Sequence, residues 1–190
     1  MTHAVSAASK GDAVKPLHNA STADSYADLP FLPAGGVASA KGFKACGIHA
    51  GFRADPKRLD FALVAADQPA ACAAVFTTNV FCSAPVTVSK EHLDGAGYGI
   101  ARAVAINSGI ANAATGDKGL QTARQSSGIV ADALGCPVQE VLVASTGVIG
   151  QHLRMEPFES GAPLAVSALS AAGGADAARA IMTTDTKPKE

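Results

Sequence analysis

Two adjacent residues, Thr146 and Gly147, have the side-chain and backbone groups that could stabilise an oxyanion. A threonine hydroxyl and the main-chain N–H of the next glycine can point at one spot, where they would hold the negative oxygen of a tetrahedral acyl-transfer intermediate. The apolar, β-branched run at residues 141–144 predicts a buried strand that delivers this pair at its end. A plain strand followed by a turn that uses glycine for a positive φ is the other interpretation of this stretch alone.

Two further clusters of hydroxyl and amide side chains could do chemistry. Residues 107–116 are dense in Asn, Ser, Thr and Gly, and they follow an apolar run at 101–106. Such a composition predicts a backbone that turns and hydrogen-bonds locally. Ser108 does not stand in a G-x-S-x-G elbow, so it is not predicted to be a nucleophile. The Thr-Thr-Asp-Thr run at 183–186 fits an N-cap or Asx-turn, or hydroxyls presented to a ligand, and nothing local decides between these.

A helix is predicted between the first two clusters. Within residues 117–134, apolar and small residues recur at three- and four-residue steps, Asp117 lies in the first turn and Gly135 follows the end. Strand, helix and strand then form a βαβ unit, whose right-handed crossover places both strand ends at one edge of a sheet. We therefore expect an α/β fold in which residues 107–116 and 145–147 share a cleft.

Other elements are predicted around this unit. Residues 60–67 and 71–77 are typical of two strands joined around Pro69 as an antiparallel hairpin, and 85–89 of a short strand. Helices are predicted at 156–170 and 176–182, with a break at the glycine pair between them.

Two polar or glycine-rich stretches are interpreted as connections. The charged residues Arg53, Asp55, Lys57 and Arg58 predict a solvated loop. The glycines at 95–99 precede a strand, whereas a dinucleotide-binding loop must follow one, so a nucleotide site is not predicted there.

Composition limits the class of protein. The chain has 190 residues, a formal net charge of −1, 48 % hydrophobic residues and no apolar run of the length that a membrane helix needs. We therefore expect one main domain at 29–190, no nucleic-acid partner and no membrane partner. Residues 1–28 lack periodicity and the features of a signal or transit peptide, and are predicted to be a disordered tail.

The cysteines predict neither a disulfide framework nor a metal site. Four cysteines are scattered through apolar segments, as expected for buried, reduced thiols. Cys46 and His49 have the spacing of half a zinc site, but no second pair has a matching spacing. No metal is therefore predicted.

Taken in order, several segments together resemble one family. These segments are residues 32–35 with 47–51, then 107–116, 144–150 and 181–186. They resemble the N-terminal half of the bifunctional ornithine acetyltransferases (glutamate N-acetyltransferases) of arginine biosynthesis. Each motif alone is modest, but the ordered set is specific, and the similarity covers about residues 29–190.

The resemblance implies a layered α/β sandwich and a mechanism. Family members are cytoplasmic, multifunctional enzymes made as one precursor that cuts itself before a threonine, giving α and β chains that assemble into hetero-oligomers. That threonine takes the acetyl group from N-acetylornithine and passes it to glutamate without a cofactor, and some members also accept acetyl-CoA as donor. By similarity, Thr146 and Gly147 match the oxyanion-hole pair, and Thr183 matches a substrate-contacting threonine.

One departure from the family concerns the nucleophile. In the family the cleavage site and its threonine follow a glycine-rich segment, which this sequence lacks. We therefore expect an N-terminal (α chain) portion whose partner is the missing C-terminal (β chain) portion, and which is inactive and poorly soluble alone. A truncated reading frame, a split gene and a fragment all fit.

Two alternatives from other classes stay open at this point. One is a non-catalytic ligand-binding or assembly module. The other is the N-terminal half of a related self-processing aminopeptidase. A frame that continues into a threonine-containing junction would favour an enzyme over a module, and acetyl transfer to glutamate would separate the transferase from the peptidase.

Overall fold

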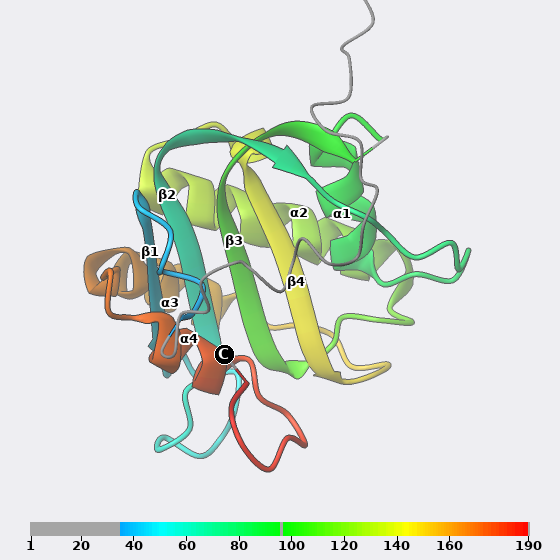
Figure 1. Cartoon of the computed structure of the whole chain (residues 1–190). Coiled ribbons are helices and arrows are strands. Elements are labelled where there is room, and N and C mark those ends of the chain that lie inside the picture. Colours follow the sequence, from blue (N-terminus) through cyan, green and yellow to red (C-terminus); the bar gives the residue numbers. More distant parts are fainter. Residues whose placement is uncertain (1–34, 96, 190) are drawn as a thin grey trace, which may run out of the picture. The chain divides into compact units, whose positions relative to one another are not determined.

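A computed structural model describes residues 35–95 and 97–189. Within them, one mixed sheet has the strand order β1-β2-β3-β4 (Figure 1). β1 pairs antiparallel with β2 and β2 antiparallel with β3, whereas β3 and β4 are parallel. The strands are β1 (Phe43–Ile48), β2 (Phe61–Ala73), β3 (Tyr98–Ile110) and β4 (Val141–Val148). The helices are α1 (Ala84–His92), α2 (Gly116–Leu134), the 3-10 turn η2 (Val138–Glu140), α3 (Glu156–Ala168) and α4 (Gly174–Ala180).

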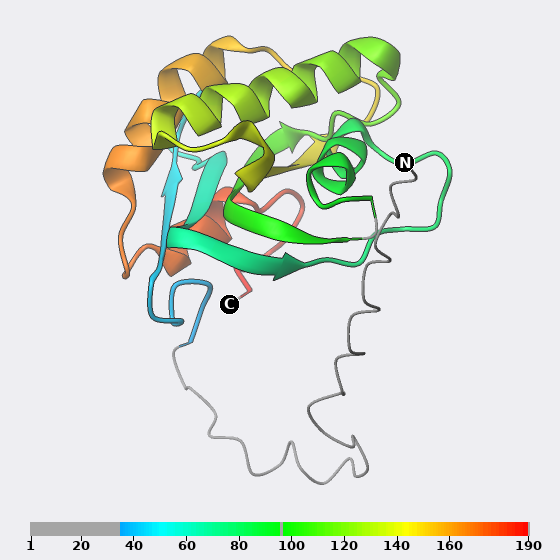
Figure 2. The ribbon, with the colours of Figure 1, turned by 90° about the horizontal axis from the view of Figure 1, so that it is seen from above.

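Helices cover both faces of the sheet, as Figure 2 shows from above. On one face, Phe61 and Leu63 of β2 point toward α2 and α3 and are fully buried with Val130. The rings of Phe52, Phe61 and Phe158 form a cluster there with centroids 4.7–5.9 Å apart, in which Phe158 packs edge-to-face with the other two. This face holds the main hydrophobic core, and the predicted α/β class is confirmed.

The opposite face is covered less completely. Ala45 of β1 and Ala62 of β2 pack against Ala177 and Ala180 of α4. Between α4 and the middle of the sheet lies a cavity of about 380 Å³, lined on the sheet side by residues such as Ile106. Small side chains let α4 lie close to β1 and β2, while β3 and β4 have no helix over this face within the described residues.

The predicted βαβ unit is confirmed. β3, α2 and β4 follow one another, and β3 and β4 pair in parallel. α2 starts at Gly116, one residue before the predicted start, and Gly135 ends it in the left-handed conformation with φ 66°. The seven alanine, serine, threonine, glycine and valine residues that α2 buries turn toward the sheet and its neighbouring helices.

The predicted hairpin around Pro69 is wrong. Residues 60–67 and 71–77 do not turn back on each other, because β2 is one continuous strand from Phe61 to Ala73 that pairs with β3 on both sides of Pro69. Its register shifts between Ala65 and Ala70, and the exposed proline lies in this irregularity. β1 pairs only as far as Ala66, so beyond it β2 is an edge strand on that side, where a missing N–H costs no sheet hydrogen bond.

The predicted strand at 85–89 is also wrong, because these residues form α1. Pro85 lies in the first turn of this helix, where its fixed φ suits the helix and its missing N–H is not needed. Val88 and Ser89 face inward. Tertiary contacts with α2 and β4 therefore override the strand preference of the β-branched residues.

The last two predicted helices are confirmed with shifted ends. α3 stops at Ala168, and α4 begins at Gly174 and ends at Ala180. The predicted disordered tail at 1–28, and the start of the domain at 29–34, lie outside the described residues.

Candidate active site at the ends of β3 and β4

The two predicted turns are in fact continuations of the strands. β3 extends through Ile110 and β4 through Val148, with Ser108 opposite Thr146 and Gly109 opposite Gly147. The polar side chains bond across the strands: Ser145 Oγ donates to Asn107 Oδ1 at 2.6 Å. The predicted shared edge is confirmed, but the polar residues extend the pairing there instead of ending it.

Gly147 and Gly109 form an unusual pair at this end of the sheet. Both have positive φ, +135° at Gly147 and +111° at Gly109. A Cβ atom at Gly147 would lie 2.3 Å from the carbonyl carbon and oxygen of Gly109. Only glycine avoids both the backbone strain and the clash, so the backbone geometry beside Thr146 depends on this residue.

From the alternation of backbone groups along β4, we infer that the N–H of Gly147 faces the outer edge of the strand. Ser89 Oγ bonds both the N–H and the C=O of Val143, which therefore point away from β3. The C=O of Val148 instead accepts from Ala111 N and faces the β3 side. Because successive residues of a parallel strand alternate in direction, Gly147 points its N–H outward as Val143 does. α1 covers the outer edge at Val143 but not at Gly147.

The side chain of Thr146 lies on the face of the sheet that α4 only partly covers. Val143 packs with Val88 and Ala123 on the other face, so the even-numbered residues of β4 face the α4 side. Thr146 is half-buried beside Ser108. Among the described residues its hydroxyl has no hydrogen-bond partner. This hydroxyl therefore lies next to the N–H of Gly147, on the adjacent residue.

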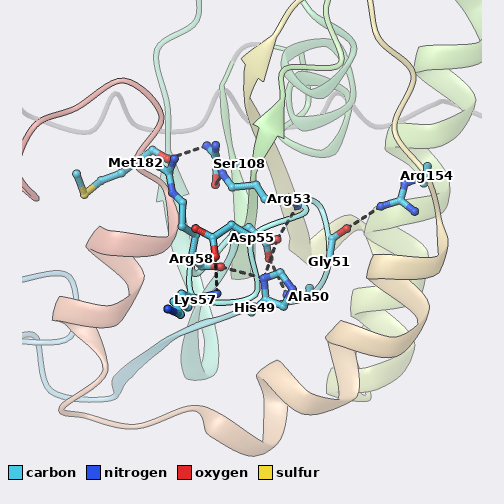
Figure 3. A network of polar contacts seen from close by, with 11 residues as sticks. His49, Ala50, Gly51, Arg53, Asp55, Lys57, Arg58, Ser108, Arg154 and Met182 are labelled. Carbon is cyan, nitrogen blue, oxygen red and sulfur yellow. Dashed lines mark hydrogen bonds and ion pairs between the residues drawn. The ribbon is translucent and has the colours of Figure 1, made fainter.

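Thr183 is brought to the same region by a set of contacts to the chain after α4. Arg53 Nη2 donates to the carbonyl of Met182 at 2.9 Å, and Arg53 Nε lies 3.3 Å from Ser108 Oγ (Figure 3). Since Ser108 is the neighbour of Thr146, one guanidinium connects the strand end with the residue before Thr183. The structure therefore places the three predicted site residues around one end of the sheet.

Asp185 organises the Thr-Thr-Asp-Thr run locally. Its carboxylate accepts from Thr183 N at 3.3 Å and from Lys189 Nζ at 2.5 Å. The hydrogen bond from Lys189, followed by the one from Thr183 N, lowers the pKa of Asp185. The aspartate thus makes a turn contact and caps no helix, and the Thr183 hydroxyl is not used by this turn.

Two polar residues of the site were missed by sequence reasoning. The predicted solvated loop is wrong for Arg53, which is half-buried, and the carboxyl of Asp60 is fully buried with 0 % exposure. Asp60 accepts from Ala50 N at 2.6 Å and from Arg53 N at 2.8 Å. Burial, with the positive charge of Arg58 second, lowers the pKa of Arg53. A charged loop beside a strand carries no pattern that separates these two residues from solvated neighbours.

The half zinc motif is used for other contacts. Cys46 Sγ donates to the carbonyl of Ala165, and burial raises the pKa of its thiol. His49 Nδ1 lies 2.9 Å from the carbonyl of Arg58 and 3.3 Å from Asp60. Within 35–95 and 97–189, no three His, Cys, Asp or Glu side chains are grouped as a metal would require. In the same part of the chain, no helix has both the length and the apolar character needed to cross a bilayer.

Comparisons with known proteins identify the family of this chain. The profile of the ArgJ family matches residues 44–190. The chain belongs to the ArgJ family. It is 49 % identical over 156 residues to the "Arginine biosynthesis bifunctional protein ArgJ" of a Synechococcus species, covering 82 % of this chain and 37 % of the relative. The protein of that name from Nitratidesulfovibrio vulgaris is 50 % identical over 152 residues, or 80 % of this chain and 38 % of the relative. The chain thus spans somewhat more than a third of these curated relatives.

Solved structures of ArgJ proteins have the same fold. The crystal structure of the arginine biosynthesis bifunctional protein ArgJ from Bacillus halodurans matches with a TM-score of 0.71 at 39 % identity, over 80 % of this chain and 78 % of that one. Ornithine acetyltransferase from Mycobacterium tuberculosis, solved in complex with ornithine, matches with a TM-score of 0.76 at 39 % identity, over 83 % of each chain. The layered α/β fold expected from the resemblance is confirmed as the fold of these acetyltransferases.

Proposed function

We propose that this chain supplies the N-terminal half of an acetyltransferase site that moves an acetyl group from N-acetylornithine to glutamate in arginine biosynthesis, in the cytoplasm. The observation that carries the proposal is the end of β4, where a Thr146 hydroxyl without a described partner adjoins the outward N–H of Gly147. Membership of the ArgJ family supplies the reaction class.

The two donors would act on the oxygen that becomes negative during acyl transfer. When a nucleophile attacks the acetyl carbonyl, its oxygen gains a full negative charge in the tetrahedral intermediate. The Thr146 hydroxyl and the Gly147 N–H would both donate to that oxygen. The acetylation of the nucleophile and the transfer to the glutamate amine each pass through such an intermediate, so one pair of donors would serve both steps.

The nucleophile would come from outside this chain. By similarity to the family it is the N-terminal threonine of the C-terminal (β chain) portion, released by self-cleavage, whose own α-amine can act as base. That portion is the proposed partner, and the working unit is a hetero-oligomer. The proposed reaction uses no cofactor, and acetyl-CoA is a further donor that the same oxyanion site would accept. Thr183 would contact the substrate.

The proposal can be tested on the complex that forms in the native cell. The chain is tagged, isolated from its source, and every co-purifying polypeptide is measured by intact mass, followed by assays of acetyl transfer from N-acetylornithine to glutamate. We expect a partner that begins with threonine, together with acetyl transfer. Release of amino acids from peptides without acetyl transfer would identify a peptidase instead. A lone chain with neither activity would leave a non-catalytic module.

A further inference from the structure

We propose that Arg53 is a positioning residue, whose guanidinium sets the position of Thr183 relative to the Thr146–Gly147 pair. The effect of Arg53 on acetyl transfer rests on the proposed function. The effect of Arg53 on the position of Thr183 can be measured without any substrate. The residue would touch neither the acetyl group nor the nucleophile. It would act through the two chain segments that it joins.

The Arg53 guanidinium contacts two acceptors. Nη2 donates to the carbonyl of Met182 at 2.9 Å, and Nε lies 3.3 Å from Ser108 Oγ. These acceptors are 74 residues apart in the sequence and belong to different layers, the end of β3 and the chain that follows α4. A guanidinium presents its donors in a rigid fork, so holding both acceptors fixes their separation.

The backbone of Arg53 is itself held by a buried carboxylate. Its N–H donates to the buried carboxylate of Asp60 at 2.8 Å, and the N–H of Ser108 donates to the carbonyl of Asp60 at 2.8 Å. Residue 60 therefore anchors both the start of the Arg53 side chain and the strand that the side chain reaches. A side chain whose base and target share one buried anchor loses little further freedom when it bonds.

The Arg53 side chain lies against Gly109 of β3. A Cβ atom on Gly109 would be 3.3 Å from Arg53 Cγ, so the arginine stem passes directly against the glycine that faces Gly147. Arg53 therefore contacts both parts of the candidate site. One part is Ser108 and Gly109 on β3, and the other is Met182, the residue before Thr183. Arg58 Nη2 adds a longer contact of 3.4 Å to the carbonyl of Thr183.

Lysine cannot reproduce this arrangement. A single ammonium nitrogen can approach the Met182 carbonyl or the Ser108 hydroxyl, but it lacks the planar fork that spans the two. Arg53→Lys therefore keeps the charge and loses the bridge, and Arg53→Met keeps much of the stem and loses both. Arg154→Met is the matched control, because Arg154 also bonds this loop, at the Gly51 carbonyl (2.7 Å), but has no contact with Met182 or Ser108.

The first measurement uses the protein as it is isolated from cells, with any partner chain and without substrate. Hydrogen exchange is followed by mass spectrometry in peptides covering residues 181–188, with the melting temperature measured on the same samples. For Arg53→Met we expect exchange there to be roughly tenfold faster, and to exceed any change in α2 or the core strands. Arg53→Lys should give a smaller change, and Arg154→Met none. Unchanged exchange at 181–188 in Arg53→Met, or an equal rise throughout the chain, would overturn the positioning role.

The second measurement uses the complex isolated from cells, with N-acetylornithine as the varied substrate. If Arg53 places Thr183, Arg53→Met should raise KM by no more than the loss of the Thr183 contact itself, about 2- to 12-fold, and leave kcat within about threefold. A fall in kcat at constant KM, or no change in either constant, would contradict the positioning role of Arg53. A wild-type complex that transfers no acetyl group would refute the proposed function, while the exchange experiment would still decide the role of Arg53.

Discussion

The two ends of the β3–β4 pair differ in what occupies the outer edge of β4. Near its start, α1 closes the edge: Ser89 bonds both backbone groups of Val143, and His92 Nδ1 lies 2.9 Å from the carbonyl of Val141. Near its end, no helix of residues 35–95 or 97–189 covers the edge, and Val148 is 52 % exposed. The same two strands therefore serve stability at one end and a candidate site at the other.

A strand edge can thus be closed along one part and left open along another. Unpaired edge groups invite unwanted pairing, and the usual remedy is to cover them. Here α1 covers only the first part of the edge, and a pair of positive-φ glycines distorts the last part. The part of the β4 edge that α1 leaves uncovered therefore lies beside Thr146.

Gly147→Ala should have the largest effect and should abolish the difference between the two ends. The added methyl carbon would overlap the Gly109 carbonyl in a backbone conformation that alanine rarely adopts. We expect a loss of about 3 kcal/mol or more in the free energy of unfolding, measured by denaturant titration. Gly150→Ala is the matched control, because Gly150 also has a positive φ (+81°) but nothing within 4 Å of its Cβ position. Equal destabilisation by the two variants would contradict the close approach of Gly109 and Gly147.

Ser89→Ala should weaken the closed end alone. It would leave the N–H and C=O of the buried Val143 without their partner, which we expect to cost about 1–3 kcal/mol of unfolding free energy. Ser160→Ala, at an exposed serine of α3, should change the same quantity by less than about 0.5 kcal/mol. If Ser89→Ala left stability unchanged in thermal and chemical unfolding, the edge would not be closed by this contact.

Thr183→Ala should affect substrate binding at the open end and leave the closed end intact. The loss of one hydroxyl contact predicts a rise in KM of about 2- to 12-fold in the isolated complex, with kcat retained. Thr184→Ala removes the hydroxyl of the exposed neighbour and should change neither constant. A Thr183→Ala complex with the wild-type KM and kcat would count against this role.

The pH dependence of the segment around Thr183 should be the smallest effect. The pKa of Asp185 is lowered, chiefly by the hydrogen bond from Lys189, so its contacts are fully present above the ordinary value of 3.8 and are lost as the pH falls through the lowered value. The amide resonance of Thr183 should therefore shift with a midpoint below 3.8. Asp185→Asn should remove the transition, and a midpoint above the ordinary value would show that the contacts do not favour the carboxylate.

Sequence reasoning predicted the elements whose local patterns agree with their packing. α2 has regular apolar spacing and a glycine after its end, and β4 has a β-branched start, so the βαβ unit and the meeting of its strand ends followed from pattern alone. The prediction of Thr146 and Gly147 as site residues rests on residue type, position and family resemblance together.

The parts that could not be predicted depend on contacts between distant residues. β2 passes through Pro69 because its pairing with β1 has already ended, and α1 forms from strand-like residues because it packs on α2 and β4. Arg53 and Asp60 belong to the site through partners that only the fold brings near. A charged loop in a sequence does not reveal which of its charges will be buried.

Stabilisation of an oxyanion at the open end of β4 can be tested through the turnover of Thr146→Ala in the isolated complex, with the melting temperature measured on the same preparation. The account predicts a fall in kcat of about 10²- to 10³-fold at an unchanged melting temperature, because one oxyanion donor is lost while the fold is kept. Thr146→Ser, which retains the hydroxyl, should keep most of the activity. A folded Thr146→Ala complex that transfers acetyl groups at the wild-type rate would contradict the account.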